Sequence, residues 1–184
     1  MKIAIEAQRI FRPNKHGMDF VALETIRELQ KRNDGNQYYV IVAPGEDRCL
    51  ENSANLSIIE VKYPTYPLWE QIGLPQAIKR LGVDLLHCTS NTAPLWCPVP
   101  LVLTLHDIIY LEPRQHRSPS LYQEMGWFYR RLVVPHIIKK CKKIITVSHF
   151  ECNCIQQALK IPVDQITTVY NGYSAHFRIQ KETD

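Results

Sequence analysis

Short apolar runs alternate with longer, helically patterned segments along almost the whole chain. Each run has too few residues for a helix, is rich in Val, Ile, Leu or Tyr, and stops at glycine, proline or polar residues. Continuous apolar sequence of this kind is typical of strands that are buried on both faces of a parallel sheet. The pattern predicts seven strands, at residues 2–7, 38–43, 56–61, 84–88, 101–105, 143–147 and 166–170.

Helical periodicity fills most of the gaps between these strands. After Gly17, residues at helical spacing predict a helix that ends near residues 33–35; they are Phe20, Leu23, Ile26, Arg27 and Leu29. Further helices are predicted over residues 69–81, from the N-cap Ser118 to about residue 141, and over residues 149–160. Strands that alternate with helices predict an α/β domain in which a mostly parallel sheet carries helices on both faces.

The composition is that of a globular domain, and it narrows the possible functions. The 184 residues, 45% hydrophobic and 22% charged, suffice for one α/β domain, which we place at residues 1–178 with a polar tail at 179–184. A net charge of +4 is too small to predict nucleic-acid binding. It is compatible with anionic small molecules or an acidic membrane surface.

Neither a membrane span nor a secretion signal is indicated. No apolar run approaches the roughly 18 residues that a span needs, and the first residues have the pattern of a strand. The six cysteines contain no CxxC pair, which argues against a disulfide framework and against a zinc site. We therefore expect reduced thiols, a cytoplasmic protein and no bound metal.

Two ionisable residues, His106 and Asp107, directly follow the apolar run at 101–105. Open α/β sheets bind ligands in the crevice outside the carboxyl ends of their strands, so we expect a small molecule here. A neutral imidazole can donate or accept a hydrogen bond near pH 7, and a neighbouring carboxylate can fix its tautomer. From spacing alone, a histidine bonded to a neighbouring loop explains His106 equally well.

Other predicted strands also end in polar residues, which would converge on the same rim. These residues are Glu6, His87, Thr89, Ser148 and Asn171. Structural alternatives remain open for three of them. Glu6 can pair with Arg9, Ser148 can form an S-x-x-E capping box with Glu151, and Asn171 with Gly172 signals a turn.

The first strand-to-helix connection lacks the common nucleotide-binding fingerprints. It contains neither GxGxxG nor GxxxxGK[ST], which disfavours a nicotinamide-dependent enzyme. One glycine, Gly17, stands at the start of the helix, where a small residue lets a phosphate approach the free N–H groups.

Six basic residues gather in the second half of the chain, at Arg130, Arg131, Lys139, Lys140, Lys142 and Lys143. A solvated face near a helix C-terminus explains them most simply. Docking to anionic lipid headgroups is the alternative.

Seven segments, taken in order, carry a further signal: IAIEAQRI, HGMDFVALETIREL, LWEQIGLP, VDLLHCTSNTAPL, LVLTLHDIIY, ITVSHFE and VYNGY. Together they resemble the N-terminal, acceptor-side domain of retaining GT-B glycosyltransferases of family 4, a three-layer Rossmann-like domain that forms half of the GT-B fold. The resemblance covers essentially the whole chain. Its most specific parts are T-L-H-D at 104–107 and V-S-H-F at 147–150.

The resemblance implies transfer of a hexose from a nucleotide-sugar co-substrate to a hydroxyl group of a glycan or lipid-linked acceptor. Retention of configuration, no metal and no further cofactor are implied as well, and polysaccharide biosynthesis is the expected setting. By position, His106 would contact the donor sugar, Asp107 would support its loop, and Gly17 would approach the donor diphosphate. The weaker rim candidates are Glu6, Asn91, Ser148 and Asn171.

The family's chain continues beyond the position of Asn171 and Gly172 into a second Rossmann domain that binds the donor, whereas this sequence ends at Asp184. We therefore expect that the chain needs a separate donor domain and has little activity alone. A non-catalytic module that docks on a membrane or a partner is the main alternative. A related nucleotide-sugar epimerase is a third, which the T-L-H-D segment disfavours.

Overall fold

A computed structural model describes residues 1–112 and 121–172 of the chain. Seven strands form one sheet in the order β3-β2-β1-β4-β5-β6-β7, and each neighbouring pair is parallel. They are β1 (Lys2–Glu6), β2 (Gln37–Val42), β3 (Leu56–Glu60), β4 (Leu85–Cys88), β5 (Leu101–Thr104), β6 (Lys143–Thr146) and β7 (Ile166–Thr168). All seven predicted strands are confirmed, with small differences at their ends.

The central strands are buried on both faces, as their continuous apolar sequence predicts. In β1, the neighbours Ala4 and Ile5 face opposite sides of the sheet and are 0% and 2% exposed. The chain winds from β1 outward to β3, returns to β4 beside β1, and continues to β7. The carboxyl ends of β1 and β4 therefore border the point at which the strand order reverses, where doubly wound sheets bind ligands.

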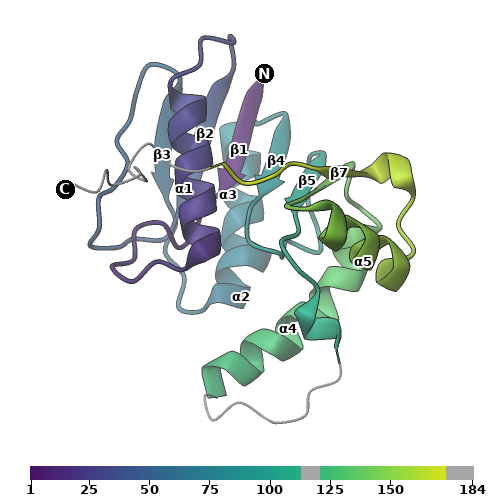
Figure 1. Ribbon diagram of the computed structural model, residues 1–184. Helices are drawn as coiled ribbons and strands as arrows, with labels where there is room; N and C mark the ends of the chain where they lie inside the picture. The colour runs from purple at the N-terminus through teal and green to yellow at the C-terminus, as the bar shows by residue number, and fades with distance from the viewer. Residues whose placement is uncertain (113–120, 173–184) are drawn as a thin grey trace, which may run out of the picture.

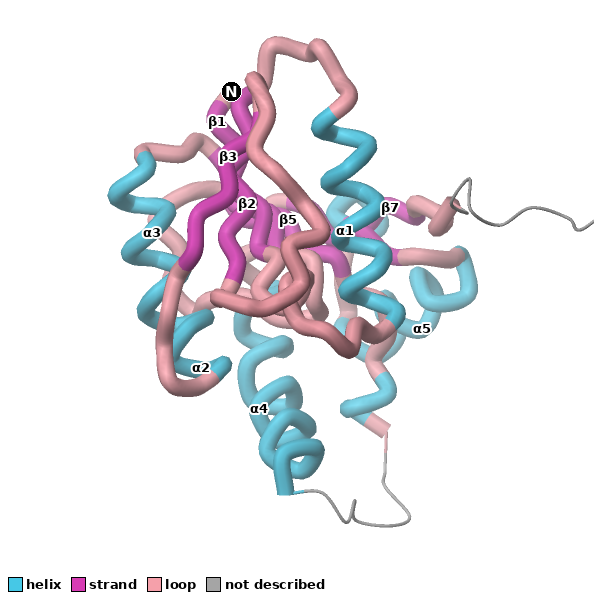
Figure 2. Tube along the Cα trace, turned by 90° about the vertical axis from the view of Figure 1, so that its left-hand side faces the viewer, coloured by secondary structure: helices cyan, strands magenta, loops and turns pink. Residues whose placement is uncertain are grey.

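Helices cover both faces of this sheet, so the predicted three-layer α/β domain is confirmed (Figures 1 and 2). The helices are α1 (Gly17–Gln30), α2 (Tyr66–Leu68), α3 (Leu74–Leu81), α4 (Leu121–Ile138) and α5 (His149–Leu159). Figure 2 shows α1 and α3 on opposite sides of the strands. In Figure 1, the first turns of α4 extend below the rest of the domain. Because α4 leads into a parallel strand, this projecting end lies at the carboxyl edge of the sheet.

The predicted helix after Gly17 is confirmed, and its inward face includes a charged residue. Phe20 is 52% exposed, and the helix buries Asp19, Ala22, Leu23 and Ile26 instead. These four residues follow the i, i+3, i+4, i+7 spacing of one helix face, and Phe20 lies about 100° away from Asp19 around the axis. Phe20 lies off the buried face because Asp19, which forms an ion pair with Arg12, takes the inward position.

The helix predicted at 69–81 begins with a wider turn. A π-helical segment, η1 (Trp69–Gly73), joins α2 to α3, and Pro75 lies in the first turn of α3, where its missing N–H costs nothing. Gly82 ends α3 in the left-handed conformation, with a φ of 60°. A Cβ at Gly73 would lie 2.6 Å from the ring of Tyr63, so only glycine fits this close approach.

Parts of the sequence-based prediction fall outside the described residues. These are the N-cap Ser118, the domain boundary at residue 178 and the tail at 179–184. Among the residues with described positions, no helix combines the length and apolar character needed to cross a membrane. All six cysteines lie in the described ranges and are unpaired thiols.

Candidate functional site

Asn91 stands at the centre of the candidate site, in the turn that follows β4. Its φ of 66° places it in the left-handed region, which asparagine tolerates better than most residues. The backbone N–H of Asn91 donates to Thr104 O over 3.2 Å. Its side-chain Oδ1 accepts the backbone N–H of His106 over 2.6 Å, and its Nδ2 donates to Asp107 Oδ2 over 3.5 Å. A side chain that is 1% exposed thus fixes the backbone at the carboxyl end of β5.

The His106 imidazole is held in one tautomer. Its Nε2 lies 3.0 Å from Thr89 O, and because a carbonyl oxygen only accepts, Nε2 carries the proton. Nδ1 of the neutral ring is then the unprotonated nitrogen, and none of the described residues donates a hydrogen bond to it. Burial lowers the pKa of His106 below its usual 6.5, although the Thr89 carbonyl and the charge of Asp107 oppose this shift. At neutral pH the ring is uncharged and presents a hydrogen-bond acceptor.

Asp107 shapes the next turn and belongs to an acidic neighbourhood. Its Oδ1 accepts the N–H of Ile109 over 3.2 Å, at the start of the 3₁₀ turn η2 (Ile109–Leu111). The pKa of Glu151, in the first turn of α5, is raised by partial burial and then by the charges of Asp107 and Glu112. The start of α5 therefore lies close to the end of β5. Spacing identified Glu151 only as a capping residue, because its proximity to Asp107 depends on strand pairing.

Glu6 lies inside the protein instead of on the rim. It is 0% exposed; its Oε1 accepts the N–H of Gln8 over 3.0 Å, and its Oε2 accepts the N–H of Thr89 over 3.3 Å. Burial raises its pKa, the Gln8 hydrogen bond opposes the rise, and the charge of Glu70 adds to it. With both oxygens bonded internally, Glu6 has no exposed surface to offer an acceptor, and it supports the turn after β4 instead.

His87, on β4, is a second histidine close to His106. Its Nε2 lies 2.8 Å from the hydroxyl of Thr104, two residues before His106. Burial, helped by the charge that His106 can carry, lowers the pKa of His87 to about 4. Both rings are therefore neutral at physiological pH, and neither brings a positive charge to the site.

The start of α1 leaves room beside Gly17. A Cβ at this position would meet no atom within 4 Å, so the space next to the first turn is open. The backbone N–H of the N-cap His16 donates to Asp19 Oδ2 over 2.7 Å, and the same carboxylate is paired with Arg12. A phosphate can approach the N–H groups of this turn from the open side. On the buried side of the turn, the charge of the Asp19 carboxylate is balanced by Arg12.

Ser148 and Asn171 lie around the start of α5. Ser148 Oγ accepts the N–H of Glu151 over 3.1 Å, which confirms the predicted helix cap. The ring of Tyr170, next to the exposed Asn171, packs edge-on against His149 at 5.5 Å between ring centres. Whether Ser148 and Asn171 also contact a ligand stays a prediction.

Sequence reasoning missed a fully buried carboxylate beside this site. Glu70, in η1, is 0% exposed and lies close enough to Glu6 to raise its pKa. The only signal was a charged residue inside the segment LWEQIGLP, which carried the family resemblance and was not considered for its chemistry.

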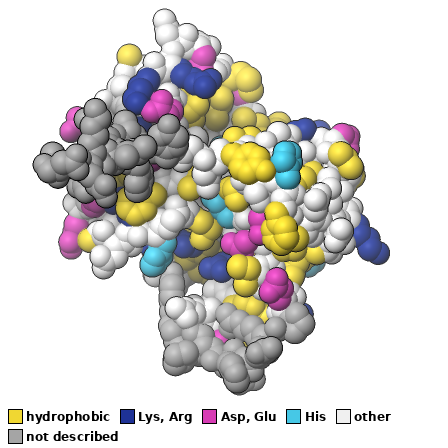
Figure 3. Space-filling model, viewed as in Figure 1, with side chains coloured by type: hydrophobic (Ala, Val, Ile, Leu, Met, Phe, Trp, Pro, Cys, Tyr) yellow, Lys and Arg dark blue, Asp and Glu magenta, His cyan; other side chains and the backbone are white. Residues whose placement is uncertain are grey.

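In the space-filling view of Figure 3, histidine and acidic side chains lie in the middle of the face, above the projecting end of α4.

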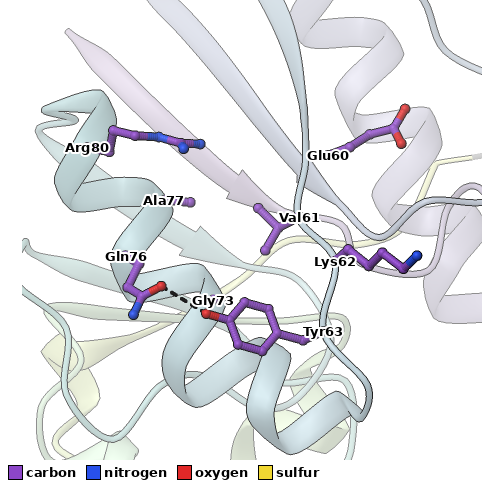
Figure 4. A pocket seen from close by; sticks show the side chains of 8 residues that line it. All are labelled: Glu60, Val61, Lys62, Tyr63, Gly73, Gln76, Ala77 and Arg80. Atoms are coloured by element: carbon purple, nitrogen blue, oxygen red, sulfur yellow. Dashed lines mark hydrogen bonds between the residues drawn. The ribbon is translucent and has the colours of Figure 1, made fainter.

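A separate hollow of about 360 Å³ lies between the end of β3 and helix α3 (Figure 4). Tyr63 donates to Gln76 Oε1 over 2.9 Å across it. Its remaining lining residues are Glu60, Val61, Lys62, Gly73, Ala77 and Arg80. It contains none of the predicted site residues and lies at the edge strand, so we assign it no part in the chemistry at His106.

Comparison with known proteins identifies the family of the chain. No curated protein matches the chain significantly. The model of Glycosyltransferase Family 4, however, matches residues 16–177 and includes the turn at Asn91, the His106–Asp107 pair and the start of α5. Because the match spans most of the sequence and the fold is the Rossmann-like one that the family's N-terminal domain has, the chain belongs to Glycosyltransferase Family 4.

Proposed function

We propose that this domain is the acceptor-side half of an enzyme that transfers a hexose from a nucleotide-sugar to a hydroxyl of a glycan or lipid-linked acceptor. Family membership gives the glycosyltransferase character. The donor, the acceptor, retention of configuration and independence of metal are part of the proposal. So are a role in polysaccharide biosynthesis and a cytoplasmic location.

The arrangement at His106 is the observation that carries this proposal. Transfer to a hydroxyl needs groups that orient sugar hydroxyls by hydrogen bonding while water is excluded. His106 is neutral, its Nε2 proton is committed to Thr89, and its Nδ1 is left as an acceptor for a hydroxyl at the carboxyl edge of the sheet. Asn91 and Asp107 hold the backbone on both sides of this ring.

The donor would lie between this domain and a second one. Open space beside Gly17 allows a diphosphate to approach the first turn of α1, whose N–H groups favour an anion. We propose that a separate domain supplies most of the donor contacts. The 184 residues alone should then bind donor weakly and transfer little sugar.

A panel of nucleotide-sugars tests this function. The assay compares the chain, the chain with whatever its gene encodes after Asp184, and the longer protein carrying His106→Ala. We expect transfer only by the longer protein and a loss of at least 100-fold in His106→Ala. The matched control is His136→Ala, an exposed histidine on α4. Activity of His106→Ala equal to that of His136→Ala would contradict the role of His106.

A second function, docking on an anionic membrane, is favoured by one observation on α4. Met125, Phe128 and Leu132 are 61%, 61% and 66% exposed, and their i, i+3, i+7 spacing forms a single apolar ridge. Arg131 on the same helix and Lys139, the first residue after it, are exposed cations. An apolar ridge with neighbouring cations fits the interface of a bilayer that contains anionic lipid.

The six basic residues predicted as one surface are not all available for docking. Lys140 Nζ donates to Leu95 O over 2.6 Å, and Lys143 Nζ donates to Asp164 O over 2.7 Å. The guanidinium of Arg131 stacks over Trp127, with its carbon 5.0 Å from the ring centre. The apolar ridge, which spacing along the sequence did not separate from the buried face of α4, becomes the main element of the docking proposal. Because α4 begins at the carboxyl edge of the sheet, docking through this helix would bring that edge of the domain toward the lipid surface.

A further inference from the structure

Glu70 accepts an unusual number of hydrogen bonds for a fully buried carboxylate. Its Oε1 accepts from Tyr66 OH over 2.7 Å and from Thr92 Oγ1 over 2.5 Å. Its Oε2 accepts from the hydroxyl of Tyr129 and from Gln71 Nε2, the latter over 3.0 Å. Burial raises the pKa of Glu70, and the hydrogen bonds from these four side chains oppose the rise. The donors come from α2, from the segment after β4, from α4 and from η1 itself.

The next residue, Gln71, binds helix α4 and the segment after β4, two of the elements that Glu70 binds. Its Nε2 lies 2.7 Å from Tyr129 OH and 3.3 Å from Ala93 O, and its Oε1 accepts the N–H of Leu95 over 2.8 Å. Consecutive residues are closer in direction in a π-helical turn than in an α-helix because the turn is wider. This geometry allows Glu70 and Gln71 to hold the segment after β4 and helix α4 together.

Two buried carboxylates therefore hold the two ends of the turn that carries Asn91. Glu6 holds Thr89 at the first end: its Oε2 accepts the N–H of Thr89, and its backbone oxygen accepts the Thr89 hydroxyl over 2.8 Å. Glu70 holds Thr92 at the other end. Between them, Asn91 binds the backbone of His106.

Stability alone is a poor explanation for this arrangement. Two carboxylates buried close together repel each other, and the charge of Glu70 raises the pKa of Glu6. Buried charged groups cost desolvation energy that apolar residues of similar size would avoid. Part of the repulsion is offset by Arg9, whose guanidinium carbon lies 5.1 Å from the ring centre of Tyr66 and whose charge lowers the pKa of Glu6. The carboxylates instead fix both ends of a short turn by hydrogen bonds, which are directional, to Thr89 and Thr92.

We propose that Glu70 is a positioning residue for His106. By holding Thr92 in place beside Tyr129 of α4, it fixes the turn at 89–92, and that turn sets the orientation of the imidazole through Asn91 and Thr89. Glu70 itself touches neither the ring nor the open side of the site. The inference rests on the proposed function only in assigning the His106 ring to the chemistry; the positioning can be measured without any substrate.

The test reads the His106 tautomer by proton–nitrogen correlation NMR of the imidazole side chains, in the 184-residue chain. Three variants weaken the hydrogen bonds of Glu70: Glu70→Gln changes the acceptor, and Thr92→Val and Tyr129→Phe each remove one donor. The matched control is Tyr38→Phe, which also removes a phenol that donates to a carboxylate, Asp34 Oδ2 at 2.6 Å, but on β2 away from the site. Thermal unfolding of each variant is measured alongside.

We expect the Nε2-protonated form to dominate in the unmodified chain and in Tyr38→Phe. In Glu70→Gln, Thr92→Val and Tyr129→Phe, the ratio of the two tautomers should shift by about fivefold. This is the size expected when one hydrogen bond of average net strength is weakened. If the variants melt at lower temperature while the His106 signals stay unchanged, Glu70 is structural support only and the proposal is wrong.

Tyr129→Phe is included in case Glu70→Gln fails to fold, because it removes one hydroxyl and leaves the carboxylate with its other donors. An unchanged tautomer in folded Tyr129→Phe and Thr92→Val would suffice to overturn the proposal. The outcome is also separable from that of the transferase assay. A shifted tautomer, together with no transfer by the longer protein in the assay, supports positioning and argues against the function. An unshifted tautomer, together with transfer by the longer protein, does the reverse.

Discussion

Asn91 Oδ1 accepts the backbone N–H of His106 over 2.6 Å and so joins the turn after β4 to the end of β5. The two residues are 15 positions apart in the chain and meet because β4 and β5 pair in parallel. Asn91 makes this hydrogen bond with a φ of 66°, in the left-handed region. One residue thus combines a backbone conformation that few side chains adopt with a hydrogen bond that nothing else on the turn supplies.

Substituting Asn91 separates these two contributions. Asn91→Ala should lower the free energy of unfolding by about 3 kcal/mol, because it leaves the N–H of His106 without its partner and places alanine in the left-handed region. Asn91→Gly removes the same hydrogen bond but tolerates the backbone, so it should cost about 1 kcal/mol less. Urea unfolding at constant pH measures both. Equal stabilities for the two variants would show that the left-handed conformation is not retained in solution.

Ser148 allows its capping role to be distinguished from a role in ligand binding. Ser148→Ala should cost about 1 kcal/mol, since the N–H of Glu151 loses its partner. Ser148→Asp keeps an acceptor at the N-cap and should restore the stability. If Ser148 also contacts an anionic substrate in the active enzyme, Ser148→Asp should be stable but should raise KM. Unfolding curves and transferase kinetics on the same two variants give the answer, and normal kinetics in Ser148→Asp would restrict Ser148 to capping.

His87 should make the stability depend on pH. Its pKa is about 4 in the folded protein and 6.5 when unperturbed, so between these values the unfolded chain binds more protons. Stability that is fully present above pH 6.5 should therefore be lost as pH falls toward 4, by up to about 3 kcal/mol.

The comparison of the unmodified chain with His87→Gln isolates this contribution. Glu6 and Glu70 act in the opposite direction, because their raised pKa values favour the folded protein below the ordinary carboxyl pKa and disfavour it as pH rises. They contribute equally to both proteins. The difference in unfolding free energy should grow between pH 4 and 6.5 and be constant above that range. A difference that does not change with pH would contradict the burial of a neutral His87.

The ridge on α4 should govern binding to lipid vesicles. Phe128→Ser and Leu132→Ser should each weaken sedimentation with phosphatidylglycerol-containing vesicles by about tenfold, the value of burying one large apolar side chain. Phe20→Ser is the matched control, since Phe20 is 52% exposed on α1 and should not contribute. Arg131→Glu should weaken binding most at low salt.

Other occupants of the ridge give different results in the same experiment. Vesicles of neutral lipid should bind poorly, and equal binding to neutral and anionic vesicles would remove the role assigned to the cations. If the unmodified chain self-associates in gel filtration and Phe128→Ser does not, the ridge is an interface between two copies and the membrane proposal is wrong.

The sequence by itself determined the secondary structure and the general place of the chemistry. Continuous apolar runs specify strands buried on both faces, and the residues that follow such runs must lie at the carboxyl edge of a parallel sheet. His106, Asp107 and the cap at Ser148 could therefore be predicted from their positions in the chain. The pattern was less informative for α1, where periodicity identified the helix but did not show that Asp19 is buried and Phe20 exposed.

Only the tertiary structure decided which polar side chains are accessible and which are internal. Glu6 has the same local signature as His106, a polar residue after an apolar run, yet the fold buries it against the turn that follows β4. Asn91, two residues after Thr89, is likewise buried and bound to the end of β5. The network of Glu70 has no periodic signature, because its donors Tyr66, Thr92 and Tyr129 are 4, 22 and 59 residues away. Local pattern records what a residue prefers next to its neighbours in sequence, whereas burial and hydrogen bonding depend on which distant segments the fold brings beside it.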